Sequence, residues 1–270
     1  MDYSLNAILF AFGLSLFAGL STGIGSLMAF FTKRTNTRFL AISLGFSAGV
    51  MIYVSFMEII PEALNALKDV YGEGKGEWIA IICFFAGIAF IGIIDRLIPS
   101  AENPHELTTV EAASEAMVSG DPKLMRLGMM TALAIAIHNF PEGMATFTSA
   151  LIDPGLGIAI AIAVAIHNIP EGIAVSIPVY YATGNRKKAF WLSLSSGLSE
   201  PVGALMVWLV LMPFMSPAVM GVIFSVIAGI MVFISIDELL PSAEKYGEHH
   251  LSIYGLIAGM AVMAVSLLIL

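Results

Sequence analysis

Long apolar stretches alternate with short polar ones along the whole chain. The apolar stretches cover residues 5–31, 40–66, 78–98, 127–150, 156–182, 188–212, 217–240 and 251–270. Each is long enough to cross a bilayer as a helix, because a spanning helix needs roughly 20 mainly apolar residues. The pattern predicts an all-α membrane protein with eight transmembrane helices in a single domain, residues 1–270.

The basic residues predict the orientation of these helices. Of the 12 Lys and Arg residues, all but Lys68 and Lys75 lie in or beside the connections after the first, third, fifth and seventh stretches. Basic residues collect on the cytoplasmic side of membrane proteins. Both termini are therefore expected outside the cytoplasm. The one long connection, the acidic segment 99–126, is expected to be a cytoplasmic loop.

The composition excludes several classes of protein. Hydrophobic residues make up 58% of the chain and charged residues 12%, and the mean hydropathy is +0.91, far from a soluble domain. This composition, with a net charge of −8, argues against a nucleic-acid partner. Cys83 is the single cysteine, so the chain has no internal disulfide and no paired-cysteine metal site. No Lys or Arg precedes the first stretch, which favours a spanning helix over a cleaved leader.

Similar segments recur in stretches that would run in opposite directions. Glu58–Pro61 (EIIP) in the second stretch resembles Glu238–Pro241 (ELLP) in the seventh, and the fourth and fifth stretches share a motif. The pattern predicts an inverted repeat of three, two and three helices, which is typical of membrane transporters. The similar segment Asp95–Pro99 (DRLIP), after the third stretch, does not fit this scheme.

The shared motif is histidine–asparagine–apolar–proline–glutamate–glycine, at His138–Gly143 and His167–Gly172. Both copies lie inside apolar stretches, where polar side chains are costly and by default mark an ion or substrate pathway. In a helix, the histidine and the glutamate four residues later lie on the same face. Two such helices facing each other would bring two imidazoles, two carboxylates and two amides to one point. These are suitable ligands for a divalent transition metal such as zinc.

One carboxylate can serve two metal positions, because each glutamate also follows an asparagine by three residues. The glutamates would bridge a position beside the histidines and a second position beside the asparagines. A lone buried histidine is more often a hydrogen-bonded packing residue than a ligand, but the duplication favours ligation. The candidate ligands are His138, Asn139, Glu142, His167, Asn168 and Glu171.

Other acidic residues interrupt the apolar stretches. Glu200, in the middle of the sixth stretch, is a further candidate ligand, because an unpaired carboxylate there is otherwise costly. Glu58 lies nearer the end of its stretch; it is a candidate ligand, with an interfacial carboxylate as the alternative. For Asp237 and Glu238 the interfacial interpretation is favoured.

These residues resemble the ZIP (ZRT/IRT-like) family of divalent-metal transporters over essentially the whole chain. Beyond the two motifs, Ser43–Gly49, Ser55–Glu58 and Ser235–Leu239 resemble its bacterial zinc-uptake branch. The resemblance implies eight helices, a binuclear metal centre between the fourth and fifth, and movement of helices 1, 4, 5 and 6 against the others. It also implies that Glu58 is a ligand where many relatives have histidine. The implied sites are His138, Glu142, His167 and Glu171, and Asn139, Glu142, Asn168, Glu171 and Glu200.

The sequence thus predicts a cell-membrane importer of divalent metal, zinc first, with iron(II), manganese, cobalt and cadmium as further substrates. Oxygen and imidazole ligands without thiolate suit metals of borderline softness. No catalytic cofactor is expected; the partners are the metal and the bilayer, with a homodimer allowed. The alternative is an intramembrane zinc-dependent hydrolase. It is disfavoured because catalytic zinc usually has three protein ligands, an open position and a separate general base.

Overall fold

The computed structural model describes residues 3–31, 36–97, 109–110, 113–114, 123–244 and 249–269, where every regular element is a helix. Most of the predicted loop 99–126 lies outside the described residues, as do the orienting residues Lys33, Arg34 and Lys245. In the described part, seven helical stretches are long and apolar enough to cross a membrane. The all-α prediction is therefore confirmed. The count of eight spanning helices stays a prediction.

Five of the long elements are single helices: α1 (Leu5–Ala29), α4 (Lys75–Leu97), α6 (Lys123–Ile152), α7 (Pro154–Thr183) and α12 (His249–Ile269). The others consist of segments joined end to end. The first set is α2 (Thr37–Val54), η1 (Ser55–Ile59) and α3 (Ile60–Tyr71). The second is α8 (Arg186–Gly197), α9 (Ser199–Met206), η2 (Val207–Leu211) and η3 (Met212–Phe214). The third is α10 (Pro217–Ile234), η4 (Ser235–Leu239) and α11 (Leu240–Glu244).

Three of these segments, η1, η2 and η4, are π-helical turns that begin six residues before a proline: Pro61, Pro213 and Pro241. Proline has no N–H to donate to the carbonyl four residues back, and a widened turn lets the helix continue up to it. In η1 the N–H of Ile60 bonds to the carbonyl of Ser55, and in η4 that of Leu240 bonds to Ser235. The two similar sequence segments thus have the same backbone form.

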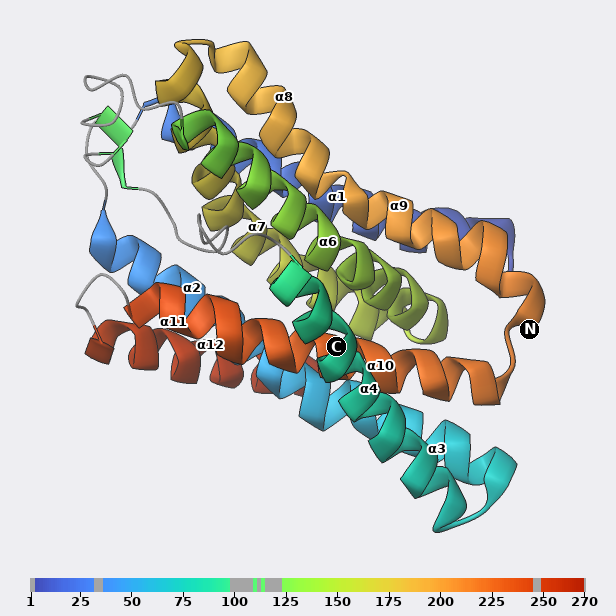
Figure 1. Cartoon of the computed structure of the whole chain (residues 1–270). Coiled ribbons are helices and arrows are strands. Elements are labelled where there is room, and N and C mark those ends of the chain that lie inside the picture. Colours follow the sequence, from blue (N-terminus) through green and yellow to red (C-terminus); the bar gives the residue numbers. More distant parts are fainter. Residues whose placement is uncertain are drawn as a thin grey trace.

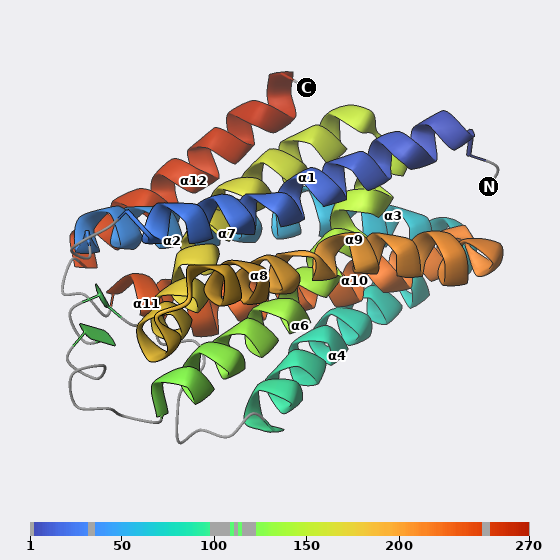
Figure 2. The same ribbon diagram turned by 90° about the horizontal axis from the view of Figure 1, so that it is seen from above.

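The helices form two bundles (Figure 1). The first bundle comprises α1, α6, α7, α8 and α9, and the second comprises α2, α3, α4, α10, α11 and α12. Within the first, α7 packs against α1 and α6; within the second, α2 packs along α12 and α10 along α4. The bundles meet where α2 packs on α7, with Leu44, Ala48, Ile160 and Val164 in one apolar core. Seen from above, α4 and α12 lie at opposite edges of the molecule (Figure 2).

The glycines that end the two motifs let the first bundle close around its polar residues. A Cβ atom at Gly143 would collide with the carbonyl of Glu200, and one at Gly172 would collide with the carbonyl of Thr22. Backbones approach this closely only where a side chain is absent. Each motif therefore ends at a helix contact, with α9 in one copy and with α1 in the other.

Candidate metal centre

A tight turn brings the two motifs to the same depth in the first bundle. Asp153 is the single residue between α6 and α7. Its Oδ1 accepts hydrogen bonds from the N–H groups of Gly155 and Leu156, at 2.7 and 3.2 Å, and so caps α7. His138 precedes Asp153 by 15 residues and His167 follows it by 14. In an antiparallel hairpin these nearly equal separations place the two histidines side by side.

The candidate ligands on α6, α7 and α9 are all buried. Each exposes 5% or less of its surface: His138, Asn139, Glu142, His167, Asn168, Glu171 and Glu200. Charged and amide side chains are rarely buried to this extent unless they are paired or bind an ion. The structure thus buries seven of the eight residues that the sequence singled out.

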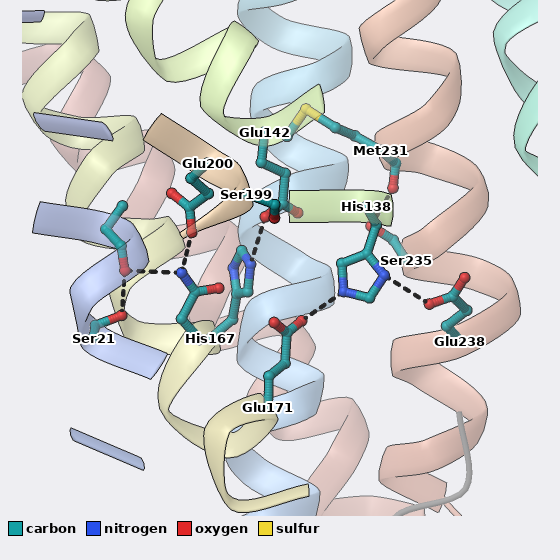
Figure 3. Close-up of polar contacts among 12 residues, drawn as sticks. Ser21, His138, Glu142, His167, Glu171, Ser199, Glu200, Met231, Ser235 and Glu238 are labelled. Carbon is teal, nitrogen blue, oxygen red and sulfur yellow. Dashed lines mark hydrogen bonds and ion pairs between the residues drawn. The ribbon is translucent and has the colours of Figure 1, made fainter. Parts of the chain in front are cut away.

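The imidazole of each motif bonds to the carboxylate of the other motif (Figure 3). Nε2 of His138 lies 3.2 Å from Oε1 of Glu171, and Nε2 of His167 lies 3.1 Å from Oε2 of Glu142. The spacing of four residues places a histidine and a glutamate on one helix face, but the hydrogen bonds run between helices. His138 lies 15 residues before Asp153 and Glu171 lies 18 residues after it. Glu142 lies 11 residues before Asp153 and His167 lies 14 after it. In each pair, the two distances from the turn thus differ by three residues, about one helical turn.

Glu200 joins this centre from α9 (Figure 3). The amide Nδ2 of Asn168 donates to Oε1 of Glu200 and also, at 2.9 Å, to the carbonyl of Ala18 on α1. Both side chains are fully buried. The asparagine of the second motif therefore connects α1, α7 and α9.

Glu238 is a residue that the sequence did not favour as part of this centre. It exposes 6% of its surface, and its Oε2 lies 3.5 Å from Nδ1 of His138 (Figure 3). The expectation of an interfacial carboxylate is therefore wrong for Glu238, although the neighbouring Asp237 is exposed. The contact also links the bundles, since Glu238 belongs to η4 of the second. The available signal was the resemblance of its segment to that of Glu58.

Glu58 lies in a different environment. It is half-buried in η1, and its carboxylate is close enough to those of Glu62 and Asp153 to be repelled by both. Asp153 marks the turn between α6 and α7, so this group of acids lies toward that end of the first bundle. The role of Glu58 as a metal ligand stays a prediction.

Several polar atoms of the centre have no hydrogen-bond partner. They are Nδ2 and Oδ1 of Asn139, Oε1 of Glu142, Nδ1 of His167, Oδ1 of Asn168, Oε2 of Glu171 and Oε2 of Glu200. A buried polar atom without a partner costs about 1–3 kcal/mol, so such atoms usually bind water or an ion. In the described residues, no three His, Cys, Asp or Glu side chains are gathered around one point. Instead, Nε2 of each histidine faces one glutamate of the other motif, and Nδ1 of His138 faces Glu238 on its other side.

Comparisons with known proteins show which family the chain belongs to. The ZIP zinc transporter family matches residues 2–123 and 98–267. The zinc transporter ZupT of Lysinibacillus sphaericus is 62% identical over 265 residues, which cover 97% of this chain and 98% of that protein. Those of Streptococcus mutans and Oceanobacillus iheyensis are 61% and 60% identical, over 96% and 98% of this chain and 97% and 100% of theirs.

These matches extend over nearly the whole chain and include both motifs. They confirm the family resemblance that the motifs indicated, and they agree with helices suited to crossing a membrane more than once. The chain therefore belongs to the ZIP family of zinc transporters and is a multi-pass protein of the cell membrane.

Proposed function

We propose that this chain imports divalent metal ions, zinc foremost, through a binuclear centre between α6 and α7. The family and its zinc-transporting relatives support the substrate. One structural observation carries the proposal: two buried histidines, each bonded to the glutamate of the other motif. Ionisable groups buried inside spanning helices are energetically unfavourable, so their presence there indicates a function.

The histidine–glutamate pairs have nearly the spacing that zinc requires. Two ligands at about 2.1 Å from a tetrahedral zinc ion are about 3.4 Å apart. The measured separations of the two pairs are 3.2 and 3.1 Å. Zinc can therefore replace the shared proton of each pair with little backbone movement, while side-chain rotation gathers the remaining ligands. Because zinc needs the deprotonated imidazole and carboxylate, its binding releases protons.

A second metal position in this proposal uses the amides and Glu200. Its support is the set of open oxygen atoms on Glu142, Asn168, Glu171 and Glu200. Oxygen ligands suit harder cations than imidazole does. Manganese and iron(II) are therefore included as further substrates, and cobalt and cadmium are included because the first position offers imidazole as well as carboxylate. Glu58 is kept in the proposal as a ligand of the first position.

The proposed route across the membrane depends on the two bundles. The first bundle carries both motifs and Glu200, whereas the second contributes Glu238 across the interface. We propose that the first bundle moves against the second, so that the centre opens to one side of the membrane at a time. The 3.5 Å contact between His138 and Glu238 would break and re-form in each cycle.

The proposal also includes α6 as the eighth spanning helix, with both termini outside, the loop 99–126 in the cytoplasm and the 3+2+3 inverted repeat. With 30 residues, α6 is about 45 Å long, which exceeds a hydrocarbon core of roughly 30 Å. It is not among the seven stretches that are apolar enough to span, although α7, which has the same motif, is. We propose no hydrolase activity, because both histidines and all three glutamates are assigned to metal binding. A homodimer stays a prediction.

Zinc uptake by the purified full chain in liposomes that contain a zinc-sensitive dye tests this function. Uptake should exceed that of empty liposomes and should fall when cadmium, cobalt, manganese or iron(II) competes. A double variant, Glu142→Gln with Glu171→Gln, is the matched control, because it preserves side-chain volume but removes both bridging charges. Wild-type uptake no faster than that of the double variant or of empty liposomes would falsify the proposal.

A further inference from the structure

A row of polar residues continues along α6 from the centre toward the turn at Asp153. Asn139, Glu142, Thr146 and Ser149 are separated by three, four and three residues, so they lie on one face of the helix. The row is about 15 Å long, since each residue adds roughly 1.5 Å. Thr146 and Ser149 expose 0% and 1% of their surface.

The hydroxyls of Thr146 and Ser149 have no hydrogen-bond partner. A threonine or serine inside a helix commonly donates to the carbonyl four residues back. On the same helix, Thr131 bonds to the carbonyl of Leu127 at 3.0 Å, and Thr148 bonds to that of Met144 at 2.7 Å. Thr146 and Ser149 leave this bond unmade. Such buried, open hydroxyls indicate a water molecule or an ion that binds them.

The opposite face of α6 is apolar. Ile137, Phe140 and Met144 line a cavity of about 530 Å³ that α4 and α10 close from the second bundle. Ser199 is the one polar residue among its lining residues, all of which the structure describes. The row from Asn139 to Ser149 thus lies on the side of α6 that faces away from this apolar cavity, as in a helix that lines a wet passage on one side only.

Acidic residues gather where the row of hydroxyls ends. The carbonyl of Ser149 accepts a hydrogen bond of 2.9 Å from the N–H of Asp153. Asp153 is exposed, and both it and Glu62 act electrostatically on the half-buried Glu58. Carboxylates at the mouth of a passage raise the local concentration of cations.

From this placement we infer that Thr146 and Ser149 form an inlet that leads the metal ion from the acidic mouth at Asp153 to Glu142. The inference rests on the proposed function and adds two residues to it. In the inlet, the hydroxyl oxygens bind the ion or its remaining hydration waters while it sheds its outer shell. Thr146 and Ser149 are positioning residues, and neither belongs to the binuclear centre.

Cysteine accessibility tests the inlet directly. Cys83 is the single native cysteine, so a Cys83→Ser background carries one added thiol at a time. Thr146→Cys and Ser149→Cys are compared with Thr148→Cys, which is also buried, at 3% exposure, but whose native hydroxyl bonds to its own helix. A small, cationic, water-soluble methanethiosulfonate is added outside proteoliposomes, with and without zinc, and labelling is read by mass.

Cysteines at positions 146 and 149 should label about tenfold faster than at 148, because thiol reactivity follows solvent access. Zinc should slow labelling at 146 and 149 and leave 148 unchanged. Equal labelling at all three positions, or labelling indifferent to zinc, overturns the inlet while leaving the import function standing. Absence of zinc uptake by the wild-type chain overturns the import function and the inlet together.

Uptake by hydroxyl variants provides a second measurement. Thr146→Val keeps the shape and removes the hydroxyl, so zinc uptake at low zinc should fall about fivefold, the equivalent of one hydrogen bond of roughly 1 kcal/mol. Thr146→Ser should restore it, and Thr148→Val should remain close to the wild type. Uptake by Thr146→Val equal to that of Thr148→Val contradicts the inlet.

Discussion

The two bundles differ in how many buried polar atoms they leave without a hydrogen-bond partner. In the second, the hydroxyls of Ser225, Ser235 and Ser252 each donate to a carbonyl of their own helix. In the first, the buried atoms without partners belong to the motifs, to Glu200 and to hydroxyls on α1 and α6. Of the 12 described residues with such an atom, only Ser47 and Ser55 belong to the second bundle. Open polar groups suit a passing cation and have no use in a scaffold.

The bundles are alike in how they hold together. Many glycines lie so close to the backbone of another helix that an added Cβ would collide with it. In the part of the chain that the structure describes, that other helix always belongs to the same bundle as the glycine. Gly45 and Gly49 contact α12, for example, and Gly143 and Gly203 join α6 to α9. Apolar side chains alone form the core shared by the two bundles. Such contacts therefore hold each bundle together, and none of the described glycines forms one between the bundles.

The largest expected effect comes from the glutamates of the first bundle. Glu142→Gln or Glu171→Gln should each lower zinc uptake about 100-fold or more, since loss even of a supporting residue costs 10–100-fold. His138→Ala should cost less and shift preference toward harder cations, because the oxygen-rich position remains. Glu77→Gln is the control, because it alters a partly exposed carboxylate of the second bundle that pairs with Lys68, away from the centre. Near wild-type uptake by Glu142→Gln at normal membrane abundance would contradict the shared centre.

A substitution at a close helix contact should come next. Gly143→Ala forces a methyl group against the carbonyl of Glu200, and overpacking costs about 1–3 kcal/mol. We expect a lower unfolding temperature in detergent and reduced uptake, because α9 carries Glu200 away from the centre. Gly13→Ala is the control, since nothing lies within 4 Å of its added Cβ. An equal unfolding temperature for both variants would show that α6 and α9 are not in close contact.

The contact between the bundles should have a moderate effect. Glu238→Gln removes the charge that faces His138, and uptake should fall about fivefold, as for the loss of roughly 1 kcal/mol. Unfolding temperature should change little, since the contact joins bundles and does not hold either one together. Asp237→Asn, an exposed neighbour, should transport zinc at the wild-type rate. Identical uptake by the two variants would remove Glu238 from the transport route.

The smallest effect should be found in the second bundle. Ser225→Ala removes a hydroxyl that bonds only to the carbonyl of Gly221, so the free energy of unfolding should change by about 0.5 kcal/mol or less. Zinc uptake should not change. A loss of uptake comparable to that of Thr146→Val would show that buried hydroxyls of the second bundle also contribute to transport, which contradicts the proposed difference between the two bundles.

The sequence by itself determined the class of protein and most of the residues of the buried polar cluster. Apolar stretches of spanning length require helices, because a bilayer offers no partner to backbone N–H and C=O groups. The duplicated motif then identified the buried histidines, asparagines and glutamates, since helical periodicity places residues four apart on one face. Glu200 followed from the cost of a carboxylate in the middle of an apolar stretch.

Only the tertiary structure decided which side chains meet. The turn at Asp153 sets the register of α6 against α7, so His138 reaches Glu171 and not the glutamate of its own motif. Glu58 and Glu238 also show that local sequence does not predict tertiary contacts. Each lies in a π-helical turn ahead of a proline. Their similar sequences produce the same local backbone, because missing proline N–H groups act within one helix. Packing between the bundles then places Glu238 against His138 and Glu58 near Asp153. The sequence around each glutamate does not predict which of these positions it takes.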